Sequence, residues 1–335
     1  MINQDFWAIT AYFNPARWAT RLANYRLFRQ ALNIPLITVE WSPDGSFQLK
    51  KDDADLLVQV QGGDLMWQKE RLLHQAFNLL PQNAKYVAWL DCDLIFADEG
   101  WVDEAREALD HALVVQPYRD VIYLDNPASH LLGSGASISF LFANRADLPV
   151  RHSFASLYEK YSAHIEAIDL DTRFKRENPF ECYSVMQRPA YGHAWAGRVE
   201  EFRRVGLFDR CVLGGGDLFF CYGVIGKSHS LISNHLEIGW DYYTGGEGYR
   251  RWSENASRYC GGKLTSTSNT LLHLFHGTLG NRQYKSRIDG LKPFQLDLDN
   301  DIKALEGQPW SWARERKKLN EYFMRYMKNR NEDAS

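Results

Sequence analysis

The stretch "KYVAWLDCDLIF", residues 85 to 96, carries two aspartates inside a run of apolar and aromatic residues. Such a run predicts a buried strand, and Asp91 and Asp93 lie near its end, one position apart. Because alternate side chains of a strand point the same way, both carboxylates could reach a site beyond the carboxyl end of the strand. Two such carboxylates suit Mg²⁺ or Mn²⁺, whereas the simpler alternative is a pair of helix-capping or turn aspartates.

The segments around this stretch alternate between strand and helix patterns. Strands are predicted at 6–13, 34–41, 85–96 and 121–125. Helices are predicted with Pro15 in the first turn, from Asp64 as N-cap to Leu80, and after Asp98 as the next N-cap. This alternation predicts a parallel, doubly wound sheet, in which ligands bind outside the carboxyl ends of the strands.

The alternation weakens after about residue 125. Later strands are predicted at 191–198, followed by a short helix, and at 269–277. From about residue 310 a helix rich in Arg and Lys carries an apolar stripe of Leu319, Phe323 and Tyr326. We expect this helix to pack on the domain, with contact to an anionic membrane surface as the alternative.

Composition excludes several classes of protein. The 335 residues include 39 basic and 42 acidic side chains, and the formal net charge of -3 lacks the positive field of a general nucleic-acid binder, although local basic patches remain. Five cysteines without CxxC spacing indicate neither a zinc ribbon nor a disulfide framework. Because no run of about 18 apolar residues occurs, we expect a cytoplasmic protein without a membrane span.

Two histidines in "HLFHG" offer further metal ligands. His273 and His276 are three positions apart, so on a strand they would face opposite sides and at most one would join the metal. We prefer His276, because it lies at the predicted strand end beside Gly277, where backbone can approach a ligand closely. An imidazole ligand shifts the preference from Mg²⁺ toward Mn²⁺. The alternative is a histidine satisfied within the core.

Asp217 ends a glycine run, "GGGD" at 214–217, and opens the apolar stretch "LFFCYGVI", which is predicted to be a helix. Aspartate is a good helix N-cap, which is the structural interpretation of this position. The functional interpretation is a carboxylate that takes a proton from an attacking hydroxyl. The sequence alone leaves both interpretations open.

Other candidate binding residues follow from their positions. In "YGHAWAGR" His193 and Trp195 are expected on one face of a strand, where an aromatic face suits a sugar ring, although Trp195 also fits a core. Lys69 precedes the acidic strand and could meet phosphate charge, unless it is a solvated helix cation. Glu40 ends the second predicted strand, where it could accept hydrogen bonds from ribose or form only a loop edge.

The order of these pieces resembles the GT-A fold of nucleotide-sugar-dependent glycosyltransferases. The matching stretches are "FWAITAYFNP" as first strand, "WLDCDLIF" as DxD motif, "GHAWAGRVEEFRRVGLFDRCVLGGGD" as acceptor side and "HLFHGTLGNRQYKSR" as the strand with the metal-binding histidine. They are most similar to bacterial and viral galactosyltransferase-like members of the inverting group, over roughly residues 5 to 305. The resemblance implies a Rossmann-like, doubly wound mixed sheet with an acceptor-side subregion and a C-terminal helical extension.

The resemblance also implies roles for individual residues. Asp91 and Asp93 would hold the divalent ion on the nucleotide diphosphate, with His276 as a later ligand and His273 as its alternate. Asp217 would be the general base, although the multi-acid cluster of the vertebrate galactosyltransferases is absent. The implied donor-binding residues are Thr10, Tyr12, Asn14, Glu40, Lys69, Arg282 and Lys285. The implied acceptor-binding residues are His193, Trp195, Gly215 and Gly216. Arg282 and Lys285 would form a lid over the diphosphate, hinged at Gly277 and Gly280.

The resulting hypothesis is a Mn²⁺- or Mg²⁺-dependent glycosyltransferase that moves a sugar from a nucleotide diphosphate sugar, expected to be a UDP-sugar, to a glycan or other hydroxyl acceptor. The nucleotide-sugar half would span residues 1–125, the acceptor and catalytic half 126–305, and a basic helical extension 306–335. The alternatives are a phage-type enzyme that glycosylates a DNA base, a metal-dependent phosphoesterase and a noncatalytic sugar-binding module. The donor sugar, the acceptor and the oligomeric state stay open.

Overall fold

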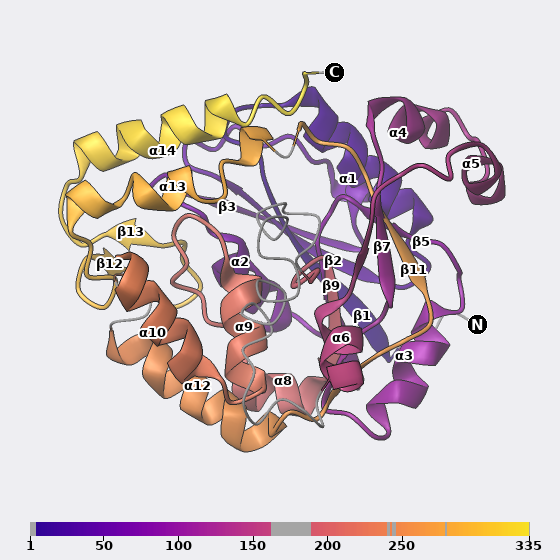
Figure 1. The fold of residues 1–335 in the computed structure, drawn as a ribbon. Coiled ribbons are helices and arrows are strands. Elements are labelled where there is room, and N and C mark those ends of the chain that lie inside the picture. The colour runs from indigo at the N-terminus through magenta and orange to yellow at the C-terminus, as the bar shows by residue number, and fades with distance from the viewer. Residues whose placement is uncertain (1–4, 162–188, 240–241, 243–245, 279, 335) are drawn as a thin grey trace.

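The central sheet has seven strands in the order β10-β6-β9-β4-β1-β2-β3. A computed structural model gives this arrangement and describes residues 5–161, 189–239, 242, 246–278 and 280–334 (Figure 1). The strands are β1 (Phe6–Phe13), β2 (Leu36–Ser42), β3 (Leu56–Gln61), β4 (Tyr86–Leu90), β6 (Val114–Gln116), β9 (Ala194–Arg198) and β10 (Leu264–Ser266). β9 runs antiparallel to β4 and β6, whereas the other neighbours pair in parallel. The mixed α/β class is confirmed, and a wholly parallel sheet is wrong because of β9.

Helices cover both faces of this sheet, as a doubly wound fold requires. On one face α1 (Ala19–Ala31) and α3 (Trp101–Leu109) share a core with Phe6 and Ala8 of β1. On the other face the core around Ile9 and Trp89 is covered by α2 (Lys69–Phe77), α8 (Val199–Val205), α9 (Gly216–Val224) and α12 (Glu247–Cys260). Figure 1 shows α12 at the lower left with α10 (Ser228–Ile238) and α9 beside it, and α8 at the bottom near the centre.

A second sheet has the order β5-β11-β7-β8, from β5 (Leu94–Phe96), β11 (Thr270–His273), β7 (Asp120–Tyr123) and β8 (Val150–His152). β11 is antiparallel to β5 and parallel to β7. A small pair joins β12 (Ile302–Lys303) to β13 (Ser311–Trp312). The remaining helices are α4 (Asn126–Gly133), α5 (Ile138–Asn144), α6 (Phe154–Tyr161), α13 (Ser286–Asp289), α14 (Lys317–Asn329) and the 3-10 turns Lys51–Asp53, Gly280–Arg282 and Lys292–Phe294.

Three predicted helix starts are wrong. α1 begins at Ala19 rather than at Pro15, because the Asn14 side chain accepts from Trp18 N at 2.9 Å and fixes a loop before the helix. α2 begins at Lys69, and Asp64 instead accepts from Trp312 N at 2.8 Å. α3 begins at Trp101, since Asp98 Oδ1 is used by Gly100 N at 2.6 Å. The side chains of the two predicted N-caps, Asp64 and Asp98, thus bond other backbone groups, and a loop fixed by Asn14 delays the first helix.

The strand expected at 85–96 is also divided. β4 ends at Leu90, and the chain re-enters a strand only at Leu94, in the other sheet. The pattern missed β3, an edge strand whose residues are half-buried or exposed and therefore give no continuous apolar run. Other predicted strands are shorter than expected. For example, β11 ends at His273 instead of reaching residue 277.

The C-terminal helix α14 packs on the domain with its predicted apolar stripe. Leu319, Phe323 and Tyr326 are buried in the core on the α2 side of the central sheet. In Figure 1 α14 runs along the top of the molecule beside α13, and the tail after it ends close to α1. Among the described residues no helix combines the length and the apolar character needed to cross a bilayer.

Phe323 tests whether α14 belongs to the folded core. Its side chain is 0% exposed, so Phe323→Ala should lower the free energy of unfolding by about 3–5 kcal/mol through lost burial and a cavity. Urea unfolding followed by tryptophan fluorescence measures this change. Lys328→Ala on the exposed side of α14 is the control, and its effect should stay within about 0.5 kcal/mol. Equal stability of the Phe323 variant and wild type would show that α14 is not part of the core.

Candidate active site

Asp91 and Asp93 lie in the turn between β4 and β5, where the chain leaves the central sheet. Asp91 N donates to His193 O at 2.7 Å, and Asp93 O accepts from Leu274 N at 2.8 Å. Cys92 between them is buried in the core on the α1 side. β4 pairs with β1, and β1 pairs with β2 on its other side, so the order of the sheet reverses at this point. In open α/β sheets the crevice at the carboxyl ends of such strands is the usual ligand site.

Asp93, His273 and His276 form a cluster in which one ligand atom from each residue lies within 4.8 Å of the others. Asp93 Oδ2 is 3.1 Å from His276 Nε2, and Asp93 Oδ1 is 4.0 Å from His273 Nε2. The two Nε2 atoms are 3.3 Å apart. The expectation that the histidines face opposite sides is wrong, because β11 ends at His273 and strand alternation does not extend to His276. Both imidazoles therefore reach the same point.

The electrostatics of the cluster fit a divalent ion. Burial, followed by the charge of Arg282, lowers the pKa of both His273 and His276 well below the usual value, so both rings are neutral. Burial and then Asp91 raise the pKa of Asp93 to about 6. Asp93 Oδ1 and His276 Nδ1 are buried without a hydrogen-bond partner. Neutral imidazole nitrogens with one carboxylate are a donor set suited to metals such as Mn²⁺.

Asp91 lies outside this cluster and pairs with Lys69. Lys69 Nζ is 2.6 Å from Asp91 Oδ1, and it is 3.1 and 3.2 Å from the two carboxylate oxygens of Asp217. Burial tends to raise the pKa of Asp91, but Lys69 and His193 outweigh it, and the pKa is lowered. For Asp217 the burial effect exceeds the effect of Lys69, and the pKa is raised. Lys69 thus forms ion pairs with both Asp91 and Asp217.

Glu70 is a buried acid that the sequence pattern did not reveal. Its side chain is 5% exposed, and burial raises its pKa to about 8. A Cβ on Gly216 would lie 2.2 Å from Glu70 Oε1, so a larger residue there would displace the Glu70 side chain. Gly215, with φ 102°, is the N-cap of α9, and Asp217 lies in the first turn of that helix rather than at the cap. A Cβ on Gly192 would lie 2.6 Å from Asp217 Oδ2, so the backbone approaches this acid closely.

Four expected donor-binding residues lie in or after β1 and β2, with their polar groups already bonded. Thr10 Oγ1 donates to Leu90 O at 2.7 Å, and Tyr12 OH donates to Gln48 at 3.2 Å. Asn14 holds Trp18 as described above. Glu40 is buried and accepts from Gln48 N at 2.6 Å and from Gln59 Nε2 at 2.8 Å. These contacts give all four a structural role beside the crevice.

The two cations of the expected lid lie in different environments. Arg282 is placed at the cluster, with Nη2 2.9 Å from His276 Nε2. Lys285 is 82% exposed and pairs with Asp289 at 3.2 Å. Gly277, an expected hinge, has φ 85°, and a Cβ there would lie 3.0 Å from Arg330 O. Arg282 is therefore close to the candidate metal site, whereas Lys285 lies at the surface.

His193 and Trp195 do not share a face, contrary to expectation. His193 has φ 72°, which interrupts the strand alternation just before β9. Its Nε2 lies 2.9 Å from Tyr123 OH, and its ring contacts His273. Trp195 is buried on the α9 side, against Phe220. His193 thus borders the cluster, and Trp195 is a core residue.

Comparison with known proteins gives little beyond this geometry. No family model matches the chain, and no curated protein is similar to it. One solved structure with a related arrangement is the apo form of mouse xyloside xylosyltransferase 1, at 10% sequence identity, covering 78% of this chain and 83% of that chain, with a TM-score of 0.28. A TM-score of this size supports no conclusion about activity.

Glu70 gives the stability of the protein a dependence on pH. Its pKa rises from 4.5 to about 8 on folding, so between these values the folded chain keeps a proton that the unfolded chain has lost. The free energy of unfolding therefore falls as pH rises through this interval. Glu70→Gln removes this titration. The Tm of the variant minus the Tm of the wild type should therefore increase as the pH rises from 5 to 8.

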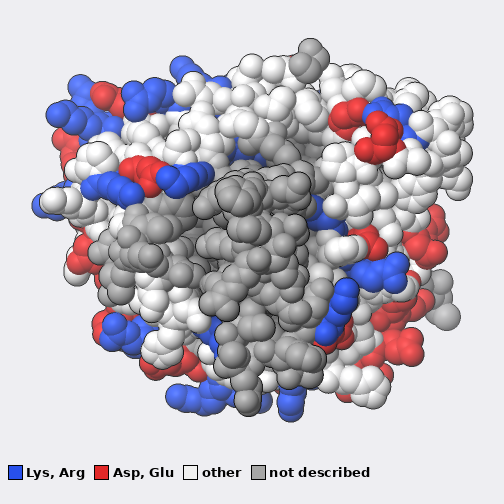
Figure 2. Space-filling model, in the orientation of Figure 1, with Lys and Arg blue, Asp and Glu red and all other residues white. Residues whose placement is uncertain are grey.

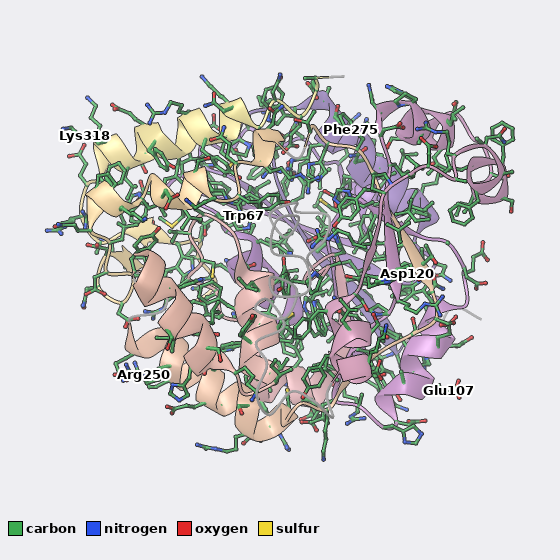
Figure 3. All side chains as sticks on the ribbon, viewed as in Figure 1. Trp67, Glu107, Asp120, Arg250, Phe275 and Lys318 are labelled. Carbon is green, nitrogen blue, oxygen red and sulfur yellow. The ribbon has the colours of Figure 1, made fainter. Side chains whose placement is uncertain are left out.

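Circular dichroism melts at several pH values measure this difference. Glu107→Gln is the control, because Glu107 is an exposed residue of α3, labelled in Figure 3. Its Tm should follow that of the wild type at every pH. If the difference in Tm between the Glu70 variant and the wild type stays constant with pH, the raised pKa of Glu70 is contradicted.

Proposed function

We propose that this protein is a metal-dependent glycosyltransferase that uses a nucleotide diphosphate sugar as donor and a hydroxyl group as acceptor. The observation that carries the proposal is the Asp93–His273–His276 cluster at the carboxyl edge of β4, where the sheet order reverses. Beside it lies Asp217, linked to the first acid of the DxD pair through Lys69. The resemblance of the DxD motif suggests the reaction class, and the Asp93–His273–His276 cluster offers ligands for a divalent ion.

The ion would be held by Asp93 together with both histidines. A bound Mn²⁺ or Mg²⁺ supplies Lewis-acid stabilisation of the charge that develops on a diphosphate leaving group. Because His273 contributes here alongside His276, the donor set is richer in nitrogen than the DxD pair alone would give. This set favours Mn²⁺ over Mg²⁺. Arg282, at the same cluster, adds a fixed positive charge for the diphosphate.

Asp217 would serve as the general base. The acceptor oxygen attacks the anomeric carbon, its proton passes to a carboxylate oxygen of Asp217, and the diphosphate leaves with the electron pair of the broken glycosidic bond. The raised pKa of Asp217 makes it a better proton acceptor than an exposed aspartate. Lys69 would then turn from Asp217 toward the donor phosphates. Attack from the face opposite the diphosphate would invert the anomeric configuration.

The acceptor is best assigned to the class of hydroxyl compounds rather than to duplex DNA. The formal net charge is -3, and Figure 2 shows Lys and Arg interspersed with Asp and Glu around the visible face. A protein that tracks a phosphate backbone usually presents a continuous positive surface. His193, close to both Asp91 and the cluster, is the acceptor-side residue that the geometry favours.

Asp93→Asn tests the metal assignment. A ligand present at 100 times its Kd stabilises the native state by about 2.7 kcal/mol, so a UDP-sugar with Mn²⁺ should raise the Tm of the wild type. The variant should lose most of this shift, because the carboxylate that joins the two histidines is gone. A thermal-shift screen of nucleotide sugars with and without Mn²⁺ gives the measurement.

The matched control is Asp103→Asn on the exposed side of α3, which should keep the full shift. The variant must melt cooperatively without ligand for the comparison to hold. If Asp93→Asn responds to Mn²⁺ and donor as the wild type does, Asp93 is not a ligand.

Asp217→Asn tests the base. Loss of a general base lowers the rate by typically 10²–10⁴-fold, while donor binding should change little because Asp217 is not among the residues of the candidate metal cluster. Release of UDP in the presence of hydroxyl acceptors measures kcat, and the thermal shift measures donor binding. Unchanged kcat would remove Asp217 from the mechanism. Phosphate release from simple esters without any acceptor would instead favour a phosphoesterase.

A further inference from the structure

The C-terminal tail after α14 brings a buried acid to the back of the candidate metal site. Glu332 is 1% exposed, and its carboxylate pairs with Arg21 of α1 at 2.5 Å and with Arg330 at 2.6 Å. Burial would raise the pKa of Glu332, but the two guanidinium groups outweigh it and lower the pKa to about 2. Glu332 is therefore a carboxylate held in place from both sides.

This carboxylate faces His276. Glu332 Oε1 lies 3.8 Å from His276 Nδ1, and that nitrogen is buried without a hydrogen-bond partner. The backbone of the tail is packed against Gly277, where a Cβ would lie 3.0 Å from Arg330 O and 3.2 Å from the Glu332 Cα. The tail thus covers the residue that directly follows His276.

Several contacts fix the tail and the histidine relative to each other. The two oxygens of Asp333 accept from Ala19 N and Thr20 N at 3.0 and 2.8 Å, at the start of α1. Asn24 of the same helix donates to Phe275 O at 2.8 Å, and Phe275 is labelled in the upper part of Figure 3. Since α1 holds both Asp333 and the residue before His276, the tail and the site are joined through one rigid element.

The opposite nitrogen of His276 shows which tautomer this arrangement favours. Arg282 Nη2 lies 2.9 Å from His276 Nε2. A guanidinium group can only donate, so Nε2 is the acceptor in this contact. The proton of the ring then lies on Nδ1, the nitrogen that faces Glu332.

We propose that Glu332 is a positioning residue that favours the Nδ1–H tautomer of His276, so that the Nε2 lone pair, which Arg282 contacts in this structure, can be donated to the metal ion; this inference rests on the metal site of the proposed function. Histidine ligands in proteins commonly donate their second ring N–H to a carboxylate, which fixes the ring and raises its basicity. Here the carboxylate comes from the C-terminal tail, far from the DxD motif in the chain. The tail is therefore part of the active site, in addition to the folding role of α14.

Binding of Mn²⁺ alone tests this role, followed by the loss of the electron paramagnetic resonance signal of free Mn²⁺. Glu332→Gln keeps the shape of the side chain but removes its charge, and it should weaken Mn²⁺ binding by about 10–100-fold. Glu321→Gln, at an exposed acid of α14, is the matched control. Because Glu321 contacts neither the histidine cluster nor the tail in the described structure, this variant should bind Mn²⁺ as the wild type does.

A second measurement uses the wild-type protein, so it can be made even if Glu332→Gln does not fold. In the metal-free wild type, nitrogen NMR of histidine-labelled protein should show His276 as the Nδ1–H tautomer, with the signal assigned from its absence in His276→Gln. Equal Mn²⁺ affinity of Glu332→Gln and wild type, or an Nε2–H tautomer, would overturn the role of Glu332 while leaving the proposed function intact. Absence of Mn²⁺ binding by the wild type would instead remove the metal site, and the role of Glu332 with it.

Discussion

The candidate site depends on the pairing of β11 with β5, which brings distant parts of the chain together at the exit of β4. Leu274 N donates to Asp93 O, and His273 pairs with Leu94 in the register of the second sheet. Without this pairing Asp93 would lie in a turn away from His273 and His276. The change of sheet after Leu90 thus divides the predicted strand and also brings Asp93 to the two histidines of the candidate metal site.

The second constraint is the burial of many charges in a small space. A buried charge without a partner costs several kcal/mol, so each must be paired or neutral. Lys69 satisfies Asp91 and Asp217 at once, while Arg21 and Arg330 satisfy Glu332. Glu70 has a raised pKa, and His273 and His276 have lowered ones, so these three are neutral near pH 7. The charges of Arg21 and Arg282 act on Asp93, but burial and Asp91 outweigh them, and its pKa is raised to about 6. Such an acid can be stabilised as a carboxylate by a bound cation.

The sequence predicted what depends on local pattern. The alternation of strands and helices, Asp91 and Asp93 at the end of β4 and the buried stripe of α14 follow from periodicity within one segment. The convergence of His273 and His276 was not predictable, because it depends on where β11 ends. Glu70 and Glu332 were missed because each is an ordinary helix or tail acid until partners from distant segments bury it. The helix start at Asp64 failed for the same reason, because the distant Trp312 N takes its side chain, whereas Asp98 and Asn14 bond backbone groups two and four residues away.

The two acids of the DxD motif, one position apart, have opposite environments. Lys69 lowers the pKa of Asp91, while burial raises that of Asp93 to about 6. A pair that shared one ion equally would need both carboxylates turned to the same point, as the strand geometry first suggested. The break after Leu90 turns them apart, so that Asp93 meets the histidines and Asp91 meets Lys69. In the proposed reaction Asp93 would therefore face the ion, and Asp91 would set the position of the lysine shared with Asp217.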